Sequence, residues 1–202
     1  MSMPTPTIAY TIRDNLYLNI TSACTLKCRF CPKHNGSWQV HDYDLSLQRN
    51  PTVQELIAAI GDPGRYREVV FCGYGEPTLR LNVVLEVADY IKSRGGKVRL
   101  NTDGLANLVY ERNVLPELQG RIDALSVSMN ATDPDVYERH CDPGLPGSFE
   151  AVVAFIEAAT RYIPEVTATA IEGLPGVDIE ACEKLAKCLG ASFRRRQLGV
   201  VG

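Results

Sequence analysis

The sequence predicts an α/β protein whose strands form a partial, open barrel. Six β-like runs alternate with amphipathic segments along the chain, and such alternation implies parallel strands joined by right-handed crossovers. The chain has 202 residues, whereas a closed barrel of eight units takes roughly 250. Six units in this length predict an open (β/α)6 TIM-type barrel, and a flat, doubly wound parallel sheet is the alternative.

The expected strands recur along the whole chain. They span Asn15 to Ile20, Glu68 to Cys72, Lys97 to Asn101, Ile122 to Ser128, Val166 to Ile171 and Ser192 to Leu198. We see no internal repeat, low-complexity tract or linker that would divide them. One domain over residues 1–202 is therefore expected.

Each expected helix has one apolar stripe at the spacing i, i+3, i+4, i+7. Thr52 and Glu55 form a capping-box signature at the start of the first helix, and the glycine pair 95–96 is expected to end the second. The third and fourth begin after Ser148 and Asp178. The stripes are Val53, Leu56, Ile57 and Ile60; Val84, Val87, Ala88 and Ile91; Val152, Phe155, Ile156 and Ala159; and Cys182, Leu185, Ala186 and Leu189.

Composition indicates an ordinary globular protein. Hydrophobic residues make up 45% of the chain and charged residues 22%, with a formal net charge of -3. This charge gives no argument for nucleic acid or an anionic membrane as the main partner. The first residues have no signal-peptide pattern, and no apolar run approaches the ~20 residues of a membrane helix. We expect a cytoplasmic protein.

Three of the seven cysteines lie within eight residues. Cys24, Cys28 and Cys31 have the spacing C-x3-C-x2-C directly after the first strand, and thiolates this close can hold one soft metal centre. Lys27 and Arg29 between them argue against three buried free thiols. A [4Fe–4S] cluster held by three cysteines would leave one iron open to another ligand.

Two other metal-binding functions compete with this interpretation. Zinc bound by the three cysteines and His34 would make a small binding module, although structural zinc sites usually have two ligand pairs and the second pair is missing here. A plain iron–sulfur electron carrier would bind a cluster but would have no use for a neighbouring ligand site.

A glycine-rich element follows the second expected strand. It reads Cys72-Gly73-Tyr74-Gly75-Glu76-Pro77-Thr78. Small residues would let the backbone approach a ligand, and strand-end carbonyls with Glu76 could accept hydrogen bonds from an ammonium group. A plain turn is the alternative. Both this element and the cysteines follow strands, at the end of an α/β barrel where sites are built.

The two motifs together resemble the radical S-adenosylmethionine (SAM) superfamily. The resemblance includes the aromatic Phe30 just before the last cysteine. It implies that Cys24, Cys28 and Cys31 hold a [4Fe–4S] cluster whose open iron binds the amino and carboxylate groups of SAM. It further implies that an external reductant of the flavodoxin or ferredoxin type drives SAM cleavage to a 5′-deoxyadenosyl radical, which abstracts hydrogen from a substrate.

The resemblance also implies a set of SAM-binding residues. The ammonium is expected at Gly75 and Glu76, the ribose and carboxylate near the third and fourth strands, and the adenine near Phe30 and Ile171, which could instead be a core residue. For residues 101–104 an ordinary Asx turn is the alternative. The expected set is Phe30, Gly73, Gly75, Glu76, Asn101, Asp103, Ser126, Ser128 and Asn130.

Longer strings resemble a short subgroup of the superfamily that is associated with TatD-type nucleases. They are Tyr10–Ile12, Asn15–Thr21, Phe71–Arg80, Arg99–Gly104 and Ser126–Ala131. This resemblance implies a functional link to such a nuclease, and it supplies no substrate.

Several remaining residues have weaker expectations. The long segment Ser37–Asn50 is a candidate lid over the site, and residues 139–144 form a loop in which His140 and Cys141 could touch substrate. Lys33 and His34 are further candidates there. The arginines 194–196 are expected mainly on a solvated edge strand, although one or two could face an anionic ligand.

The four dispersed cysteines have no expected cluster of their own. Cys72 could line the pocket but is more typical of a buried thiol. Cys182 falls on an apolar helical stripe and Cys188 falls off it, which predicts a core residue and a structural or exposed residue, respectively.

Overall fold

In a computed structural model, residues 6–199 are described, and they form a curved seven-stranded sheet. The strand order is β1-β2-β5-β6-β7-β8-β9, and only β1 runs antiparallel to its neighbour. In the described part of the chain β1 and β9 do not pair with each other, so the barrel is partial and open, as expected. The strands are β1 (Ala9–Ile12), β2 (Asn15–Leu18), β5 (Glu68–Phe71), β6 (Val98–Thr102), β7 (Ala124–Ser128), β8 (Glu165–Glu172) and β9 (Ser192–Gln197).

The sequence prediction found the six parallel strands and missed β1. This short strand forms a hairpin with β2 through a turn at Arg13 and Asp14, and Arg13 has a positive φ of 53°. The Tyr10 and Tyr17 rings stack across the hairpin with centroids 5.3 Å apart. The extra strand therefore extends the edge of the sheet beside β2.

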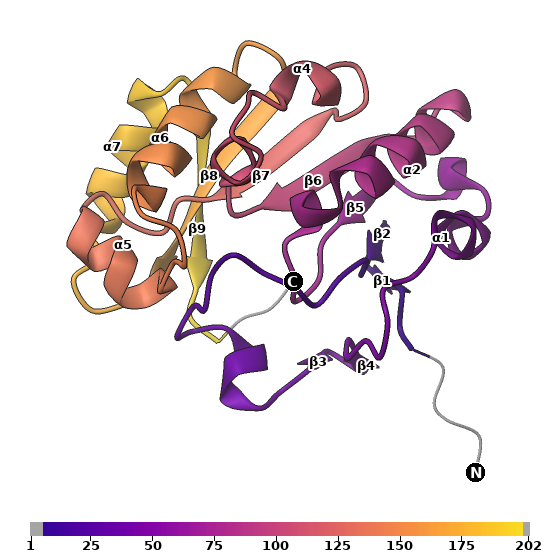
Figure 1. Cartoon of the computed structure of the whole chain (residues 1–202), viewed down its shortest axis with the longest axis horizontal. Coiled ribbons are helices and arrows are strands. Elements are labelled where there is room, and N and C mark those ends of the chain that lie inside the picture. Colours follow the sequence, from indigo (N-terminus) through magenta and orange to yellow (C-terminus); the bar gives the residue numbers. More distant parts are fainter. Residues whose placement is uncertain (1–5, 200–202) are drawn as a thin grey trace.

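The four main helices begin and end close to the predicted positions. Thr52 and Glu55 form the capping box at the start of α1, and Asp178 caps α7 through the Ala181 amide at 2.9 Å. Gly95, with φ of 73°, follows the end of α2. Figure 1 shows the helices on the outer side of the curved sheet. They are α1 (Val53–Ile60), α2 (Leu81–Ser93), α6 (Ser148–Ala159) and α7 (Ile179–Cys188).

The prediction of a loop over residues 139–144 is partly wrong, because residues 139–141 form the last turn of helix α5 (Pro134–Cys141). Asp133 accepts a hydrogen bond from the Val136 amide at 3.0 Å, and Pro134 occupies the first turn. Both features favour a helix start. The other short helices are α3 (Ala106–Val109), α4 (Leu115–Leu118) and α5 (Pro134–Cys141), with 3-10 turns η1 (Pro32–Asn35), η2 (Pro63–Arg65) and η3 (Pro77–Arg80).

The two faces of the sheet have different chemistry. Side chains alternate between them along each strand. The outward residues are apolar and form the core with the helices; Phe71, Leu100 and Val127 are fully buried among them. The inward residues of β6, β7 and β9 are polar or charged, for example Arg99 and Ser126. Helix burial thus stabilises the outer face, while the inner face surrounds a cavity.

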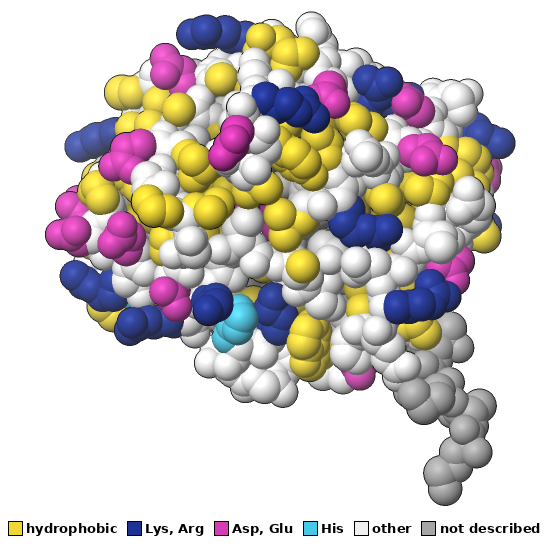
Figure 2. Space-filling view, in the orientation of Figure 1, with side chains coloured by type: hydrophobic (Ala, Val, Ile, Leu, Met, Phe, Trp, Pro, Cys, Tyr) yellow, Lys and Arg dark blue, Asp and Glu magenta, His cyan; other side chains and the backbone are white. Residues whose placement is uncertain are grey.

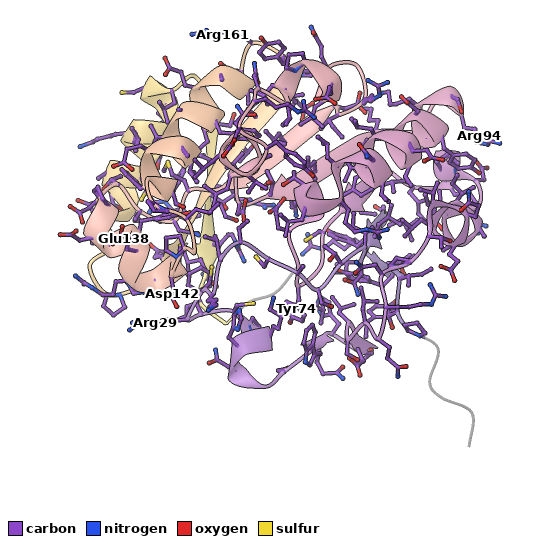
Figure 3. The ribbon with its side chains drawn as sticks, viewed as in Figure 1. Arg29, Tyr74, Arg94, Glu138, Asp142 and Arg161 are labelled. Carbon is purple, nitrogen blue, oxygen red and sulfur yellow. The ribbon has the colours of Figure 1, made fainter. Side chains whose placement is uncertain are left out.

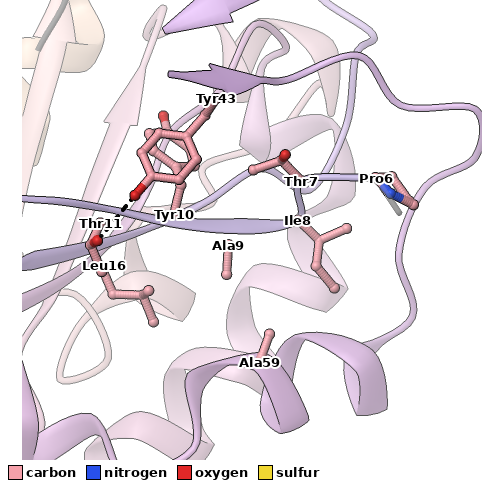
Figure 4. Close-up of a pocket in the computed structure, with 9 residues that line it drawn as sticks. All are labelled: Pro6, Thr7, Ile8, Ala9, Tyr10, Thr11, Leu16, Tyr43 and Ala59. Carbon is pink, nitrogen blue, oxygen red and sulfur yellow. Dashed lines mark hydrogen bonds between the residues drawn. The ribbon is translucent and has the colours of Figure 1, made fainter. Parts of the chain in front are cut away.

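A small ribbon occupies the predicted lid segment. Strands β3 (Gln39–Val40) and β4 (Tyr43–Asp44) pair antiparallel, and Val40 and Leu45 are buried against Tyr10. A separate shallow hollow of about 410 Å³ lies beside β1, where the Thr11 and Tyr43 hydroxyl groups are 3.3 Å apart (Figure 4).

The surface is electrostatically mixed. On the face shown in Figure 2, basic and acidic side chains are interspersed rather than gathered by sign. No helix among the described residues combines the length and apolarity needed to cross a membrane.

Candidate functional site

One cavity of about 690 Å³ opens at the carboxyl ends of the parallel strands. All twelve residues expected to bind the cluster or SAM line it, although they come from loops and strands far apart in the sequence. They are Cys24, Cys28, Phe30, Cys31, Gly73, Gly75, Glu76, Asn101, Asp103, Ser126, Ser128 and Asn130. The roles assigned to them remain proposals.

The cysteine loop is fastened to the end of α5. The amide of Lys27 donates to the Cys141 carbonyl at 3.0 Å, and the amide of Arg29 donates to the His140 carbonyl at 2.9 Å. Leu26 and Pro143 form an isolated antiparallel bridge between the same two segments. Arg29 and Asp142 accordingly lie near each other in Figure 3. The tight turn that presents the thiols is thus positioned by a segment more than one hundred residues later.

Cys141 lies beside Cys28, a contact that the sequence analysis did not foresee. A hydrogen bond with the Cys141 thiol, followed by burial, raises the pKa of Cys28. The side-chain amide of Asn130 donates to the Cys141 sulfur at 3.5 Å. Cys141 is fully buried and does not line the cavity. Cys141 therefore contacts Cys28 on the side away from the cavity and does not face a ligand.

The zinc alternative requires four ligands that converge on one ion. Among residues 6–199 no group of three or more His, Cys, Asp or Glu side chains is arranged to hold a single metal ion. His34 lies in η1, where its amide donates to the Cys31 carbonyl at 3.0 Å. The cysteines of an iron–sulfur cluster bind different irons, so they do not need to converge in this way.

The glycines of the 73–76 element are required by the protein's own packing. A Cβ on Gly75 would lie 2.2 Å from the Thr21 carbonyl oxygen and 2.7 Å from that of Ala23. The Glu76 amide donates to the same Ala23 carbonyl at 2.8 Å. At Gly75 the missing side chain therefore lets the loop after β2 pack closely, and the expected approach of the backbone to a ligand stays a prediction.

The same element leaves acceptors at the cavity wall. Among the described residues, no hydrogen bond is donated to the carbonyl oxygens of Gly73, Tyr74 or Gly75. All three residues line the cavity. An ammonium group would find acceptors here without displacing an internal hydrogen bond.

The Glu76 carboxylate is buried and already holds four donors. Thr78 donates through its amide at 2.9 Å and its hydroxyl at 2.7 Å, and Thr102 donates its hydroxyl at 2.8 Å. The Asp103 amide donates to the second oxygen at 2.7 Å. Burial, then the neighbouring Asp103 charge, raises the pKa of Glu76 to about 8. Glu76 thus joins β6 to the glycine-rich element.

Asp103 is held on the wall in an Asx turn, the expected alternative. Its Oδ1 accepts from the Leu105 amide at 3.0 Å, and its Oδ2 accepts from the Thr25 hydroxyl. This second bond ties β6 to the cysteine loop. Burial raises the pKa of Asp103 as well.

Two side-chain amides on the wall have unpartnered oxygens. The Oδ1 atoms of Asn101 and Asn130 are buried and accept no hydrogen bond from the described residues. Asn130 also has a positive φ of 62°, a conformation that asparagine adopts more readily than most residues. Because buried polar atoms normally have partners, these oxygens fit a ligand that donates hydrogen bonds.

The weaker expectations have mixed outcomes. Cys72 and Ile171 line the cavity, so the more favoured interpretation of Cys72 as a purely buried thiol is wrong. His140 does not line it; its Nε2 lies 2.8 Å from the Pro175 carbonyl. Lys33 donates to the Ser22 carbonyl at 3.1 Å. Cys182 is buried in the core and Cys188 is exposed, as predicted.

The predicted lid forms part of the cavity wall. Val40 and Leu45 line the cavity, and the Tyr74 hydroxyl, at the residue labelled in Figure 3, donates to the Gln39 carbonyl at 2.7 Å. Trp38 meets the Tyr74 ring edge to face. The ribbon is therefore joined to the glycine-rich element.

The β9 arginines divide between the two faces of the sheet. Arg194 and Arg196 line the cavity, and Arg194 donates to the Ser126 hydroxyl at 3.3 Å. The Arg195 guanidinium contacts acidic residues on β8 and α7. Arg194 and Arg195 are both exposed, as expected for a solvated edge strand, and Arg196 is half-buried; all three belong to the residues that line the cavity.

Comparisons with known proteins agree with this geometry. A family model described as the radical SAM superfamily matches residues 18–189. The chain is 30% identical over 154 residues to a putative glycyl-radical enzyme activating enzyme of Methanocaldococcus jannaschii, covering 71% of this chain and 59% of that protein. It is 29% identical over 136 residues to a probable RNA methyltransferase of Ectopseudomonas mendocina, covering 63% of this chain and 35% of that protein.

A solved structure shares the fold. SuiB of Streptococcus suis bound to S-adenosylmethionine matches with a TM-score of 0.66 at 12% identity, covering 92% of this chain and 40% of that chain. This chain therefore spans 35% and 59% of the two curated relatives and 40% of SuiB.

Proposed function

The chain belongs to the radical SAM superfamily, and we propose from this premise that it is an enzyme that cleaves SAM reductively and abstracts hydrogen from a substrate. The superfamily uses a [4Fe–4S] cluster and SAM. When bound, these groups supply a 5′-deoxyadenosyl radical as the hydrogen-abstracting species. The protein's task is to position them and to exclude competing reactants.

Cys24, Cys28 and Cys31 would hold the cluster. Their thiols lie on the cavity wall, and the loop that carries them is fixed by the backbone hydrogen bonds to the end of α5. Cluster binding requires deprotonated thiols, so Cys28, whose pKa the buried Cys141 raises in the cofactor-free chain, would have to lose its proton when the cluster binds. The chemistry of this donor set fits iron–sulfur ligation.

The opposite wall would hold SAM. The free carbonyls of Gly73, Tyr74 and Gly75 would accept from its ammonium group, and Glu76 would favour that charge from behind while keeping the turn in place. The unpartnered oxygens of Asn101 and Asn130 would accept from ribose hydroxyls. Phe30 and Ile171 would enclose the adenine.

The observation that carries the proposal is the cavity itself. Three cysteines, the glycine-rich element with its free carbonyls and two asparagines with unpartnered amide oxygens line one volume of about 690 Å³. A plain electron carrier would have no need for such a space next to its cluster. An external one-electron reductant, of the flavodoxin or ferredoxin type, would supply the electron.

The test is reductive SAM cleavage by the anaerobically reconstituted chain. With dithionite as reductant, 5′-deoxyadenosine should form, and Cys24→Ala, Cys28→Ala and Cys31→Ala should each abolish it. Cys188→Ala is the matched control, since this thiol is exposed on α7, and it should retain cleavage. Normal cleavage by Cys28→Ala would contradict the assignment.

The assignment to the TatD-associated subgroup is a finer part of the proposal. It is supported by the strings at Tyr10–Ile12, Asn15–Thr21 and Phe71–Arg80, and it implies a functional link to a TatD-type nuclease. Co-purification of the two proteins, or a change in nuclease activity when this chain is active, would support the link. If the two proteins did not co-purify and the nuclease activity did not change, the proposed link would be wrong.

A further inference from the structure

The inner face of the barrel carries three guanidinium groups. Arg99 extends from β6, and Arg194 and Arg196 extend from β9, two residues apart and hence on the same face. All three line the same cavity as the cysteines. Arg99 precedes Asn101 by two residues, so it lies about 6–7 Å deeper along the strand than the expected SAM-binding layer.

The protein pairs only one of these three charges with a carboxylate. Arg99 pairs with Glu68, with Nη2 and Oε2 3.2 Å apart. Within residues 6–199 no carboxylate lies within 4.0 Å of the Arg194 or Arg196 guanidinium. Partial enclosure, then the charges of Arg99 and Arg196, lowers the pKa of Arg194, which indicates that the three cations lie close enough to repel one another.

The outward arginine of the same strand shows the contrast. Arg195 meets three carboxylates, those of Glu172 at 3.7 Å, Glu180 at 3.3 Å and Glu183 at 3.1 Å. Arg195 also belongs to the residues that line the cavity, but its guanidinium is paired with carboxylates, whereas those of Arg194 and Arg196 have no carboxylate partner among the described residues. Clustered cations without partners are unfavourable unless an anion joins them.

The arginine side chains in this cavity also have N–H groups that donate no hydrogen bond to the described residues. Arg99 Nε is buried and has no hydrogen-bond partner among the described residues. Among the described residues Arg194 donates only to the Ser126 hydroxyl, at 3.3 Å, and the Arg194 side chain is exposed. Guanidinium groups present fixed pairs of donors that match the oxygens of carboxylates and phosphates.

We propose that Arg99, Arg194 and Arg196 form a subsite for an oxyanion of the substrate, a carboxylate or a phosphate group. The substrate would be a small anionic molecule, anchored between the β6 and β9 walls of the barrel, with its reacting carbon directed toward the cysteine end. The assignment of the anion to a substrate rests on the proposed function. The binding of an oxyanion by these arginines does not.

The test is calorimetric titration of the full chain with inorganic phosphate and with malonate, at constant ionic strength set by chloride. The double variant Arg194→Gln/Arg196→Gln should bind the preferred anion at least about tenfold more weakly, as expected for losing charge-assisted hydrogen bonds. Arg195→Gln is the matched control and should bind like the wild type. Stronger binding of malonate indicates a carboxylate group, and stronger binding of phosphate a phosphate group.

Three results would overturn the subsite. They are the absence of phosphate and malonate binding by the wild type, equal binding by the double variant, and an equal loss in Arg195→Gln. Arg196→Lys keeps the charge but not the paired donors, so it should show an intermediate loss. The double variant should melt at or above the wild-type temperature because repulsion is relieved, and this melting curve verifies that it is folded.

SAM also has a carboxylate, so its binding is the second arm. The reconstituted double variant should bind SAM within about twofold of the wild type, because the acceptors expected to hold SAM belong to the 73–75 element, Asn101 and Asn130 and not to β9. A tenfold loss of SAM affinity would assign the arginines to SAM and overturn the substrate subsite. If the chain bound anions but did not cleave SAM, only the proposed function would be wrong. If it cleaved SAM but bound no anion, only the subsite would be wrong.

Discussion

The Asp103 amide nitrogen lies 2.7 Å from the Glu76 carboxylate, and the Asp103 carboxyl group occupies the same buried wall. This relationship joins the end of β6 to the glycine-rich element after β5. It also places two acidic groups where burial raises the pKa of each. At neutral pH the pair is therefore expected to retain a proton.

Stability without bound cofactors should decrease as the pH rises from about 4.5 to about 8. A glutamate has a pKa near 4.3 in an unfolded chain, whereas Glu76 has a pKa of about 8 in the folded protein. Between these values the folded state binds more protons, so raising the pH favours unfolding. Thermal unfolding of the apo chain from pH 5 to pH 9 measures the slope.

Glu76→Gln should flatten this slope, because glutamine does not titrate. The exposed Glu157 on α6 offers a matched control, and Glu157→Gln should leave the pH dependence unchanged. A wild-type and a Glu76→Gln chain with parallel profiles would show that Glu76 does not hold the proton.

Gly75→Ala should destabilise the protein by about 1–3 kcal/mol, the usual effect of forcing an atom into a packed site. The new methyl would lie 2.2 Å from the Thr21 carbonyl oxygen, which belongs to backbone and cannot rotate away. Gly144→Ala is the control, since its Cβ would approach only the Thr25 oxygen, at 3.7 Å. Denaturant midpoints compare the two; equal midpoints would mean that the loop after β2 yields easily.

The fold was predictable from the sequence in those elements where the spacing of apolar residues alone indicates which side chains are buried. The apolar stripe and capping box of α1, and the Asp178 cap of α7, depend only on neighbouring residues. The hairpin strand β1 was missed because it is four residues long and its burial comes from Tyr17 and the ribbon around Val40. Such partners are distant in sequence, and local patterns do not report them.

The candidate site was predictable to the extent that it follows strand ends. Motifs after the strands identified the residues that line the cavity, because parallel strands bring their carboxyl ends together. The contact of Cys28 with Cys141 was not predictable, because it depends on how α5 packs against the cysteine loop. Arg194 and Arg196 could have been assigned inward from their two-residue spacing, given the alternation along β9.

Tyr137→Phe should raise the melting temperature of the cofactor-free chain by a few degrees. The Tyr137 side chain is fully buried, and its hydroxyl has no hydrogen-bond partner within the described residues. Such a hydroxyl costs about 1–3 kcal/mol, and 1 kcal/mol corresponds to about 2–4 °C in a chain of this size. Burial, then the neighbouring Cys141, raises the pKa of Tyr137.

Tyr110→Phe is the matched control with the opposite expected sign. The Tyr110 hydroxyl donates to the Thr78 carbonyl at 2.9 Å, so its removal should lower the melting temperature. If both variants shifted in the same direction, the two hydroxyl groups would have equivalent surroundings, contrary to the structure.

Cys141→Ala should leave the cluster site complete. The Cys141 thiol contacts the Cys28 sulfur and the Asn130 amide, and it lies off the cavity wall. It is therefore a neighbour of a ligand rather than a fourth ligand. The reconstituted variant should bind four irons per chain, and its reduced electron paramagnetic resonance spectrum should still change when SAM is added, whereas Cys28→Ala should fail in both measurements. A Cys141→Ala chain that lost the cluster would place this thiol on iron and leave no open coordination position for SAM, which the proposed function requires.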